Sequence, residues 1–330
     1  MIHSVNKKGK SVFKVMGKQG RKSILTICHD AGGAEVISSF IRKNQKKYRL
    51  FCFTEGPAKK VFERKGLGSM VAGENPDITG IMERTGRIDL VLTGTSWATS
   101  LEIDFIREAR RKKIKTAAYL DHWTNYRERF GYPKNDWKNN LPDEIWVGDK
   151  YALALAKKKF AGRRIKLVPN VFLGEIRRDW CKIKKSALEE KTILFVSEPI
   201  DGMKNKGESS VEIVILGKLL KLLVKNFPEI KVVIRLHPSE RINKYERIMN
   251  KYGRALKISV EANQTMFESL ARCSAVIGMK SMFLVVSVLC GKKTASFLPE
   301  KNLHCLLPDS RIAKIKNLEQ LNNWFKINFN

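Results

Sequence analysis

Two segments of the C-terminal half end apolar, β-branched runs in polar residues that could bind phosphate. In the first, VVIRLHPSE at 232–240, a strand pattern ends at His237 and Pro238. In the second, AVIGMKSM at 275–282, the strand pattern breaks and Ser281 is a natural helix N-cap. Parallel strands that end beside a helix N-terminus form a crevice in which backbone amides bind a phosphate. We therefore expect this half to hold a nucleotide-activated donor.

The residues around these strand ends have distinct expected roles. Pro238 disfavours the helical conformation at His237 and aims its imidazole along the strand axis, where it can donate to a phosphate oxygen. Lys280 would add a positive charge, and Met282 leads into an almost wholly apolar helix whose first amides are open to an anion. The alternatives are a histidine that hydrogen-bonds the strand end and an ordinary capped core helix.

Glu198 follows another strand pattern, TILFV at 192–196. It could orient a ribose or sugar hydroxyl, or it could simply cap the loop. Arg235 lies two residues before the histidine, on the same face of its strand, and we expect it to have a structural role such as pairing with Glu240.

The N-terminal half has its own candidate at the end of the strand pattern ILTIC, where HDAGGA occupies 29–34. Asp30 could act as a general base that takes the proton from an acceptor hydroxyl in a cleft between the domains, or it could only cap the next helix. Gly32 and Gly33 would let another backbone or a sugar come close. The spacing is not that of G-x-G-x-x-G, so dinucleotide binding is not indicated.

Two further turns carry polar side chains after apolar strand patterns. Thr95 and Ser96 follow DLVL and open a helix, either as ligand-binding hydroxyls or as plain caps. Asp121, His122 and Trp123 follow TAAYL and begin a long aromatic segment of a kind that is often functional. They could form a base with its partner, a nucleophile at Asp121, a sugar-binding platform, or a loop packed by its aromatic rings.

Strand-length apolar runs alternate with helix-period segments along the chain. The predicted strands are 24–28, 48–53, 90–92, 116–120, 144–147, 165–168, 192–196, 231–236, 256–259, 275–277 and 294–297. Such alternation builds parallel sheets covered on both faces, so the fold class is α/β. The strand pattern lapses at 169–191, and 330 residues exceed one typical core. We predict a basic arm at 1–20 and two doubly wound, Rossmann-like domains, 21–175 and 176–330, facing a cleft.

The net charge of +30 favours an anionic partner, which could be nucleic acid, a charged substrate or an anionic membrane surface. No nucleic-acid recognition motif is present, so no specific nucleic acid is expected. The six cysteines form no CxxC pair and there is no convincing DxD motif, so we expect neither metal nor cofactor. No apolar run reaches the roughly 18–20 residues of a membrane span, and the basic N-terminus lacks the apolar core of a secretory signal. We expect a cytoplasmic protein that can associate peripherally with the inner face of the membrane.

Taken together, His237-Pro238 and Ser281 within GMKSM resemble motifs of the GT-B glycosyltransferases of bacterial surface-polysaccharide synthesis. Similar groups are the sialyl-, polysialyl- and Kdo-type transferases, which use CMP-activated acidic sugars, and the CDP-glycerol glycerophosphotransferases. In the sialyltransferases both motifs bind the CMP moiety, and the resemblance implies that role here. In GT-B enzymes a helix entry such as that at Asn263 often contacts the base or ribose, although Asn263 is equally a plain N-cap.

The resemblance is incomplete at the catalytic base. The sialyltransferases supply it from a paired acidic D/E-D/E-G motif, and the nearest counterpart here is Asp30-Ala31-Gly32, with alanine in place of the second acid.

The leading hypothesis is a metal-independent glycosyltransferase that moves a sugar from a nucleotide-activated donor, with a CMP-sugar favoured, to a surface glycan or lipid-linked acceptor. One alternative is a GT-B-fold nucleotide-sugar epimerase or hydrolase, and another is a glycerophosphotransferase. The non-enzymatic alternative is a nucleic-acid-binding protein that exploits its charge.

Overall fold

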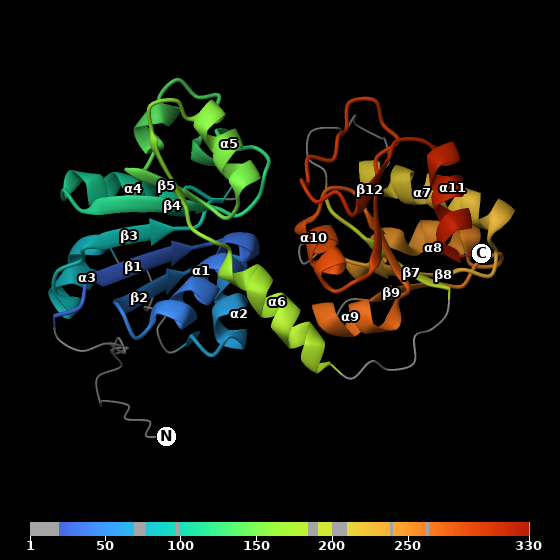
Figure 1. The fold of residues 1–330 in the computed structure, drawn as a ribbon, viewed down its shortest axis with the longest axis horizontal. Coiled ribbons are helices and arrows are strands. Elements are labelled where there is room, and N and C mark those ends of the chain that lie inside the picture. The colour runs from blue at the N-terminus through green and yellow to red at the C-terminus, as the bar shows by residue number, and fades with distance from the viewer. Residues whose placement is uncertain are drawn as a thin grey trace. The chain divides into compact units, whose positions relative to one another are not determined.

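The computed structural model describes residues 20–68, 77–96, 99–183, 191–199, 210–237, 240–261 and 264–329. The chain divides into two compact units, Met1–Glu175 (unit 1) and Ile176–Asn330 (unit 2). Each unit contains a six-stranded parallel sheet with helices on both faces, as Figure 1 shows. The predicted α/β class with two Rossmann-like domains is confirmed. The basic arm falls almost entirely outside the described residues.

The sheet of unit 1 has the strand order β2-β1-β3-β4-β5-β6. Its strands are β1 (Ser23–Cys28), β2 (Arg49–Thr54), β3 (Leu90–Thr93), β4 (Lys115–Leu120), β5 (Glu144–Val147) and β6 (Arg164–Leu167). Every pair is parallel, and in register Ile27 of β1 lies opposite Thr93 of β3. The carboxyl ends of β1, β3 and β4 therefore meet at one edge, where HDAGG, TGTS and DHW follow them.

Helices cover both faces of this sheet because the strand side chains that point to either face are apolar. The helices are α1 (Ala31–Asn44), α2 (Gly56–Arg64), α3 (Ile78–Thr85), α4 (Leu101–Arg111), α5 (Lys150–Lys159) and α6 (Val171–Lys182), which crosses into unit 2. Ile24 of β1 packs with α1 and α2, whereas Leu25 packs on the opposite face with α3 and α4. Two short 3₁₀ turns, η2 (Glu128–Phe130) and η3 (Trp137–Asn140), shape the long aromatic segment after β4.

The sheet of unit 2 has the strand order β12-β11-β10-β7-β8-β9. Its strands are β7 (Thr192–Val196), β8 (Lys231–Arg235), β9 (Ile258–Glu261), β10 (Ala275–Gly278), β11 (Lys293–Phe297) and β12 (Ile312–Ile315). The helices are α7 (Val211–Asn226), α8 (Glu246–Tyr252), α9 (Met266–Arg272), α10 (Met282–Leu289) and α11 (Leu318–Phe329), and η4 (Ile242–Tyr245) precedes α8. The leucines of α7 pack with β7, β8 and α11 in one core.

The order of this sheet places β10 and β8 on either side of β7. Glu198, His237 and Ser281 follow the carboxyl ends of these three neighbouring strands, as the sequence predicts. No helix within the described part of the chain is long and apolar enough to cross a membrane.

Candidate functional site

Asp30 lies at the carboxyl edge of the unit 1 sheet, held by two neighbours. Its Oδ1 accepts a hydrogen bond from Ser96 Oγ at 2.8 Å and lies 2.8 Å from Nδ1 of His29. Asp30 is the N-cap residue of α1, yet its side chain makes no capping hydrogen bond. The side chain is 32% exposed, so the carboxylate is both oriented by the protein and open to solvent. This arrangement suits a general base better than a helix cap.

His29 is fixed on both its backbone and its ring. Its N–H donates to Oε1 of Glu102 at 2.9 Å, and its carbonyl accepts from Ala58 N–H at 2.9 Å. Its ring lies against Gly56, where φ is +50° and a Cβ would come 2.6 Å from Nε2. Glycine is therefore required at Gly56 both for its conformation and for the space of the imidazole.

Asp121 follows β4 and forms a buried ion pair with Arg129. Nη1 of Arg129 lies 2.8 Å from Oδ1 of Asp121 and donates to Oγ1 of Thr95 at 2.8 Å. The Asp121 side chain is 12% exposed, and its Oδ2 lies where a Cβ on Gly32 would clash with it. Asp121 is thus enclosed and charge-neutralised, in contrast to Asp30.

The other glycine of the HDAGGA turn serves packing between two backbones. A Cβ on Gly33 would lie 3.2 Å from Cα of Gly94, so α1 begins in close contact with the turn after β3. Thr95 and Ser96 in that turn are buried, and their hydroxyls bond Arg129 and Asp30. The two hydroxyls position two charged side chains, and neither caps α4, whose N-cap residue is Ser100.

Trp123 does not present its ring as a sugar platform in this structure. Its side chain is 6% exposed and its indole N–H donates to Oδ2 of Asp149 at 2.8 Å. Asp149 also caps α5 by accepting from Ala152 N–H at 2.7 Å. His122 is half-buried, and its Nδ1 lies 3.0 Å from Oγ1 of Thr124. The trio is an anchored loop in which each residue has a different partner.

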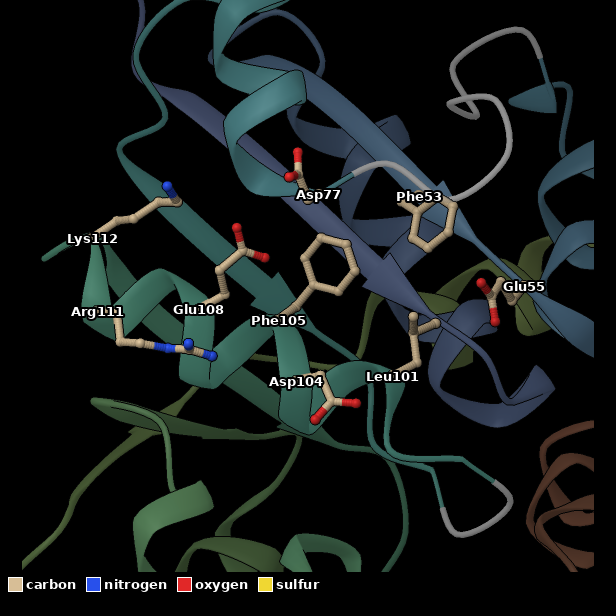
Figure 2. A pocket seen from close by; sticks show the side chains of 9 residues that line it. All are labelled: Phe53, Glu55, Asp77, Leu101, Asp104, Phe105, Glu108, Arg111 and Lys112. Carbon is tan, nitrogen blue, oxygen red and sulfur yellow. The ribbon is translucent and has the colours of Figure 1, made fainter.

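An open pocket of about 850 Å³ lies in unit 1, between the end of β2, the start of α3 and one side of α4. Figure 2 shows its two phenylalanine rings surrounded by charged side chains, with the two cations at the end away from Glu55. The lining residues are Phe53, Glu55, Asp77, Leu101, Asp104, Phe105, Glu108, Arg111 and Lys112. Four carboxylates in one pocket repel a phosphate, so this is not where a nucleotide's phosphates would bind.

In unit 2 a backbone amide just before the N-cap of α10 is bonded to a carboxylate of the protein itself. Oε2 of Glu198 accepts from the backbone N–H of Lys280 at 3.0 Å. Ser281 is the N-cap of α10, and its Oγ accepts from Phe283 N–H at 3.2 Å. Burial raises the pKa of Glu198, although the amides of Lys280 and Ser281 counter that shift. The Lys280 amide, which precedes the N-cap, is therefore already bonded within the protein.

His237 lies at the end of β8 and is exposed to solvent. Its N–H donates to Oε2 of Glu240 at 2.9 Å, and Oε1 of Glu240 accepts from Ser197 Oγ at 2.9 Å and also bonds Lys244. Glu240 thus ties the turn after β8 to the end of β7. The backbone of His237 is anchored in this way at the carboxyl edge of the sheet.

Arg235 has the structural role expected of it, but with a different partner. Its Nη1 lies 3.0 Å from Oε1 of Glu261 and donates to Ser269 Oγ at 2.6 Å. Its guanidinium also lies over the ring of Phe283, 5.2 Å from the centroid. The suggested pair with Glu240 is absent from the described contacts of Arg235. Met282 begins α10 and is half-buried, while Pro238 and Asn263 lie outside the described residues.

Three residues of the unit 1 site were not predicted from the sequence: Glu102, Arg129 and Asp149. Arg129 and Asp149 reach their partners across loops, which no local pattern reveals. Glu102 did leave a signal, because it shares the apolar face of α4 with Phe105, Ile106 and Ala109 at helical spacing. An acid on an apolar helix face indicates a buried polar contact. Among the described residues, no His, Cys, Asp or Glu side chains gather in threes in a way that would hold a metal ion.

No family model matches the chain, and neither does any curated protein. Solved structures do match it over nearly its whole length. A UDP-GlcNAc 2-epimerase from Methanocaldococcus jannaschii has a TM-score of 0.62 at 10% identity, covering 93% of each chain. A putative UDP-N-acetylglucosamine 2-epimerase from Listeria monocytogenes has a TM-score of 0.63 at 12% identity, covering 92% of this chain and 86% of that one. The UDP-GlcNAc 2-epimerase from Neisseria meningitidis, bound to UDP-GlcNAc, has a TM-score of 0.59 at 12% identity, covering 92% of this chain and 90% of that one. The chain therefore has the fold type of these two-domain, GT-B-like enzymes.

Proposed function

We propose that the protein is a glycosyltransferase that uses a nucleotide-activated sugar and takes Asp30 as its general base. The observation that carries the proposal is the Asp30 carboxylate, held by Ser96 and His29 at a sheet edge and still open to solvent. An acceptor hydroxyl would attack the anomeric carbon of the donor. As the new C–O bond forms, the bond to the nucleotide's phosphate breaks, and Asp30 takes the hydroxyl proton.

Asp30 is more accessible to a substrate than Asp121. The Asp121 carboxylate is nearly buried and already engaged by Arg129, so an acceptor hydroxyl reaches it less easily. The same pairing weakens Asp121 as a nucleophile. The inverting mechanism is therefore the one we propose.

We assign the donor nucleotide to unit 2, with His237, Lys280 and Ser281 as the groups nearest its phosphates. An imidazole at the end of β8 and a helix N-cap at the end of β10 suit a leaving phosphate without a metal. A CMP-sugar is the donor we favour, on the resemblance of the His-Pro and Ser motifs. Glu198 holds the Lys280 amide, so a phosphate that uses this amide must displace the Glu198 carboxylate.

A nucleotide-sugar epimerase is the second candidate, because the three solved structures described above are epimerases acting on, or named for, UDP-GlcNAc. An epimerase would also need an accessible carboxylate and a nucleotide site, but it would release a sugar isomer with no acceptor. The two candidates are separated by their products alone.

We further propose that unit 1 docks on an anionic membrane, where a lipid-linked acceptor would lie. From residue 150 to residue 174 the chain contains no acidic residue, and its cations there are Lys150, Lys157, Lys158, Lys159, Arg163, Arg164 and Lys166. Exposed Tyr151 and Leu167 lie within this segment. Each cation near an anionic surface contributes about 1 kcal/mol to binding.

The proposal is tested by offering the protein CMP-, UDP- and GDP-sugars with and without a glycan acceptor, and by following products by mass spectrometry. Release of the nucleotide with a gain of one sugar on the acceptor supports the transferase. An isomeric nucleotide sugar formed without acceptor supports the epimerase. No turnover of any donor, together with no thermal stabilisation by CMP, CDP, UDP or GDP, would remove both.

A further inference from the structure

Glu102 is a buried carboxyl directly behind the Asp30 site. Its side chain is 3% exposed and projects from the first turn of α4. Oε1 accepts the His29 N–H at 2.9 Å, and a Cβ on Gly94 would lie 3.8 Å from the same oxygen. Oε2 is fully enclosed and has no hydrogen-bond partner among the described residues. Glu102 therefore contacts the backbone of His29, the residue whose ring lies against Asp30.

We propose that Glu102 is a positioning residue whose buried carboxyl group sets the charge beneath the His29–Asp30 pair. The catalytic role of Asp30 rests on the proposed function, whereas the coupling between Glu102 and Asp30 does not. Protonated, Glu102 keeps its bond to the His29 amide through one oxygen and places no charge behind Asp30. Ionised, it sets a second carboxylate beside Asp30 in a poorly solvated site.

The charged groups around Glu102 support this arrangement. The pKa of Glu102 is raised to about 7 in total: burial raises it most, the His29 amide and ring lower it, and the negative charge of Asp30 raises it. Cys28, which precedes His29 at the end of β1, has its pKa raised by burial and, to a smaller extent, by the charges of Glu102 and Asp121. Arg129, the cation of this edge, is bonded to Asp121 and Thr95. No described cation pairs with Glu102, so its charged form is not compensated.

A purely structural contact makes a different prediction. If Glu102 only joined α4 to the end of β1, its protonation would not change the NMR signal of Asp30. Glutamine, which can accept the same hydrogen bond, would then leave the site unchanged. The two possibilities therefore differ in what Asp30 experiences as the pH is changed, without any substrate.

Carboxyl-carbon NMR of the full chain labelled at Asp and Glu tests the inference. In the wild type we expect one Glu Cδ signal, absent from Glu102→Gln, that titrates with a midpoint near pH 7. The Asp30 Cγ signal should show an inflection at the same midpoint, and Glu102→Gln should abolish it. Asp104→Asn is the matched control, because Asp104 lies two residues along the same helix, is 57% exposed, and should leave both signals unchanged.

Asp30→Asn gives a second, reciprocal test that does not require Glu102→Gln to fold. Because the Asp30 charge opposes ionisation of Glu102, removing that charge should shift the Glu102 midpoint to lower pH. A Glu102 midpoint in the ordinary range near pH 4–5, or one that Asp30→Asn leaves unmoved, overturns the inference. Failure of the protein to bind any nucleotide would instead overturn the proposed function, and the NMR result would stand independently.

Discussion

Replacing Glu102 by glutamine should make unit 1 more stable at alkaline pH. The folded protein raises the pKa of this carboxyl from 4.5 to about 7. A raised carboxyl pKa means that the folded state holds the proton more tightly than the unfolded state does. The contribution of this carboxyl to the stability of the folded state is therefore fully present below pH 4.5 and is lost as the pH rises through 7. The loss approaches a limit of about 3 kcal/mol above pH 8, since one unit corresponds to about 1.4 kcal/mol.

Glutamine carries no charge at any pH and removes this loss. Between pH 5 and pH 8 the free energy of unfolding of the wild type relative to that of Glu102→Gln should fall by roughly 2–3 kcal/mol. Urea unfolding, followed by tryptophan fluorescence, measures this difference in stability. The background should carry Trp180→Phe and Trp324→Phe, because the other four tryptophans belong to unit 1 and then report its unfolding alone. If the stability difference between the wild type and Glu102→Gln is the same at both pH values, Glu102 titrates normally and the prediction is wrong.

Three further predictions concern the proposed reaction and its location. Asp30→Asn should lower turnover by roughly 10²–10⁴-fold with little change in donor affinity, because it removes a proton acceptor and no donor contact. Initial-rate kinetics at varied donor concentration measures both quantities. The same pattern in Asp121→Asn, and not in Asp30→Asn, would make Asp121 the base. His237→Ala should weaken nucleotide binding by about 1–3 kcal/mol in calorimetry, and an unchanged affinity in the folded variant would exclude the imidazole from the donor site. The protein should sediment with anionic but not neutral vesicles at low salt, and it should be released near 0.5 M salt, where the Debye length is only about 4 Å. Replacing Lys157, Lys158 and Lys159 by glutamine should reduce the binding to anionic vesicles. Equal binding to neutral vesicles would point to apolar insertion.

Most of the strands could be predicted from the sequence because the central ones, such as β1, β7 and β10, are buried throughout and read as apolar runs. The predicted strand 231–236 corresponds to β8 (Lys231–Arg235), and 275–277 to β10 (Ala275–Gly278). The edge strand β12 (Ile312–Ile315) was missed, because the four residues IAKI form too short an apolar pattern within a polar segment. Helix α3 was also missed, because its eight residues include only a short apolar pattern.

The start of α4 shows why element boundaries near a site are hard to predict. Thr95 and Ser96 look like helix caps, and the predicted helix therefore began at residue 96. The helix begins at Leu101 instead, because the two hydroxyls bond Arg129 and Asp30 rather than free helix amides. Local capping rules do not register a partner that comes from another strand end.

The acidic residues at the strand ends were predicted, but their division of roles was not. Strand position placed both Asp30 and Asp121 at one sheet edge. What distinguishes them is the Arg129 side chain, which comes from the 3₁₀ turn η2 and pairs with Asp121 alone. The engagement of the Lys280 amide by Glu198 likewise depends on the adjacency of β7 and β10, which sequence order does not reveal.

We propose that the oriented, solvent-accessible carboxylate of Asp30 takes the proton in a reaction of a nucleotide sugar. The decisive measurement is nucleotide release from a panel of CMP-, UDP- and GDP-sugars, followed in parallel for the wild type, Asp30→Asn and the control Asp104→Asn. We expect the wild type and Asp104→Asn to consume one donor in the presence of acceptor, and Asp30→Asn to lose at least 100-fold of that rate. Equal release by the folded Asp30→Asn variant would contradict it.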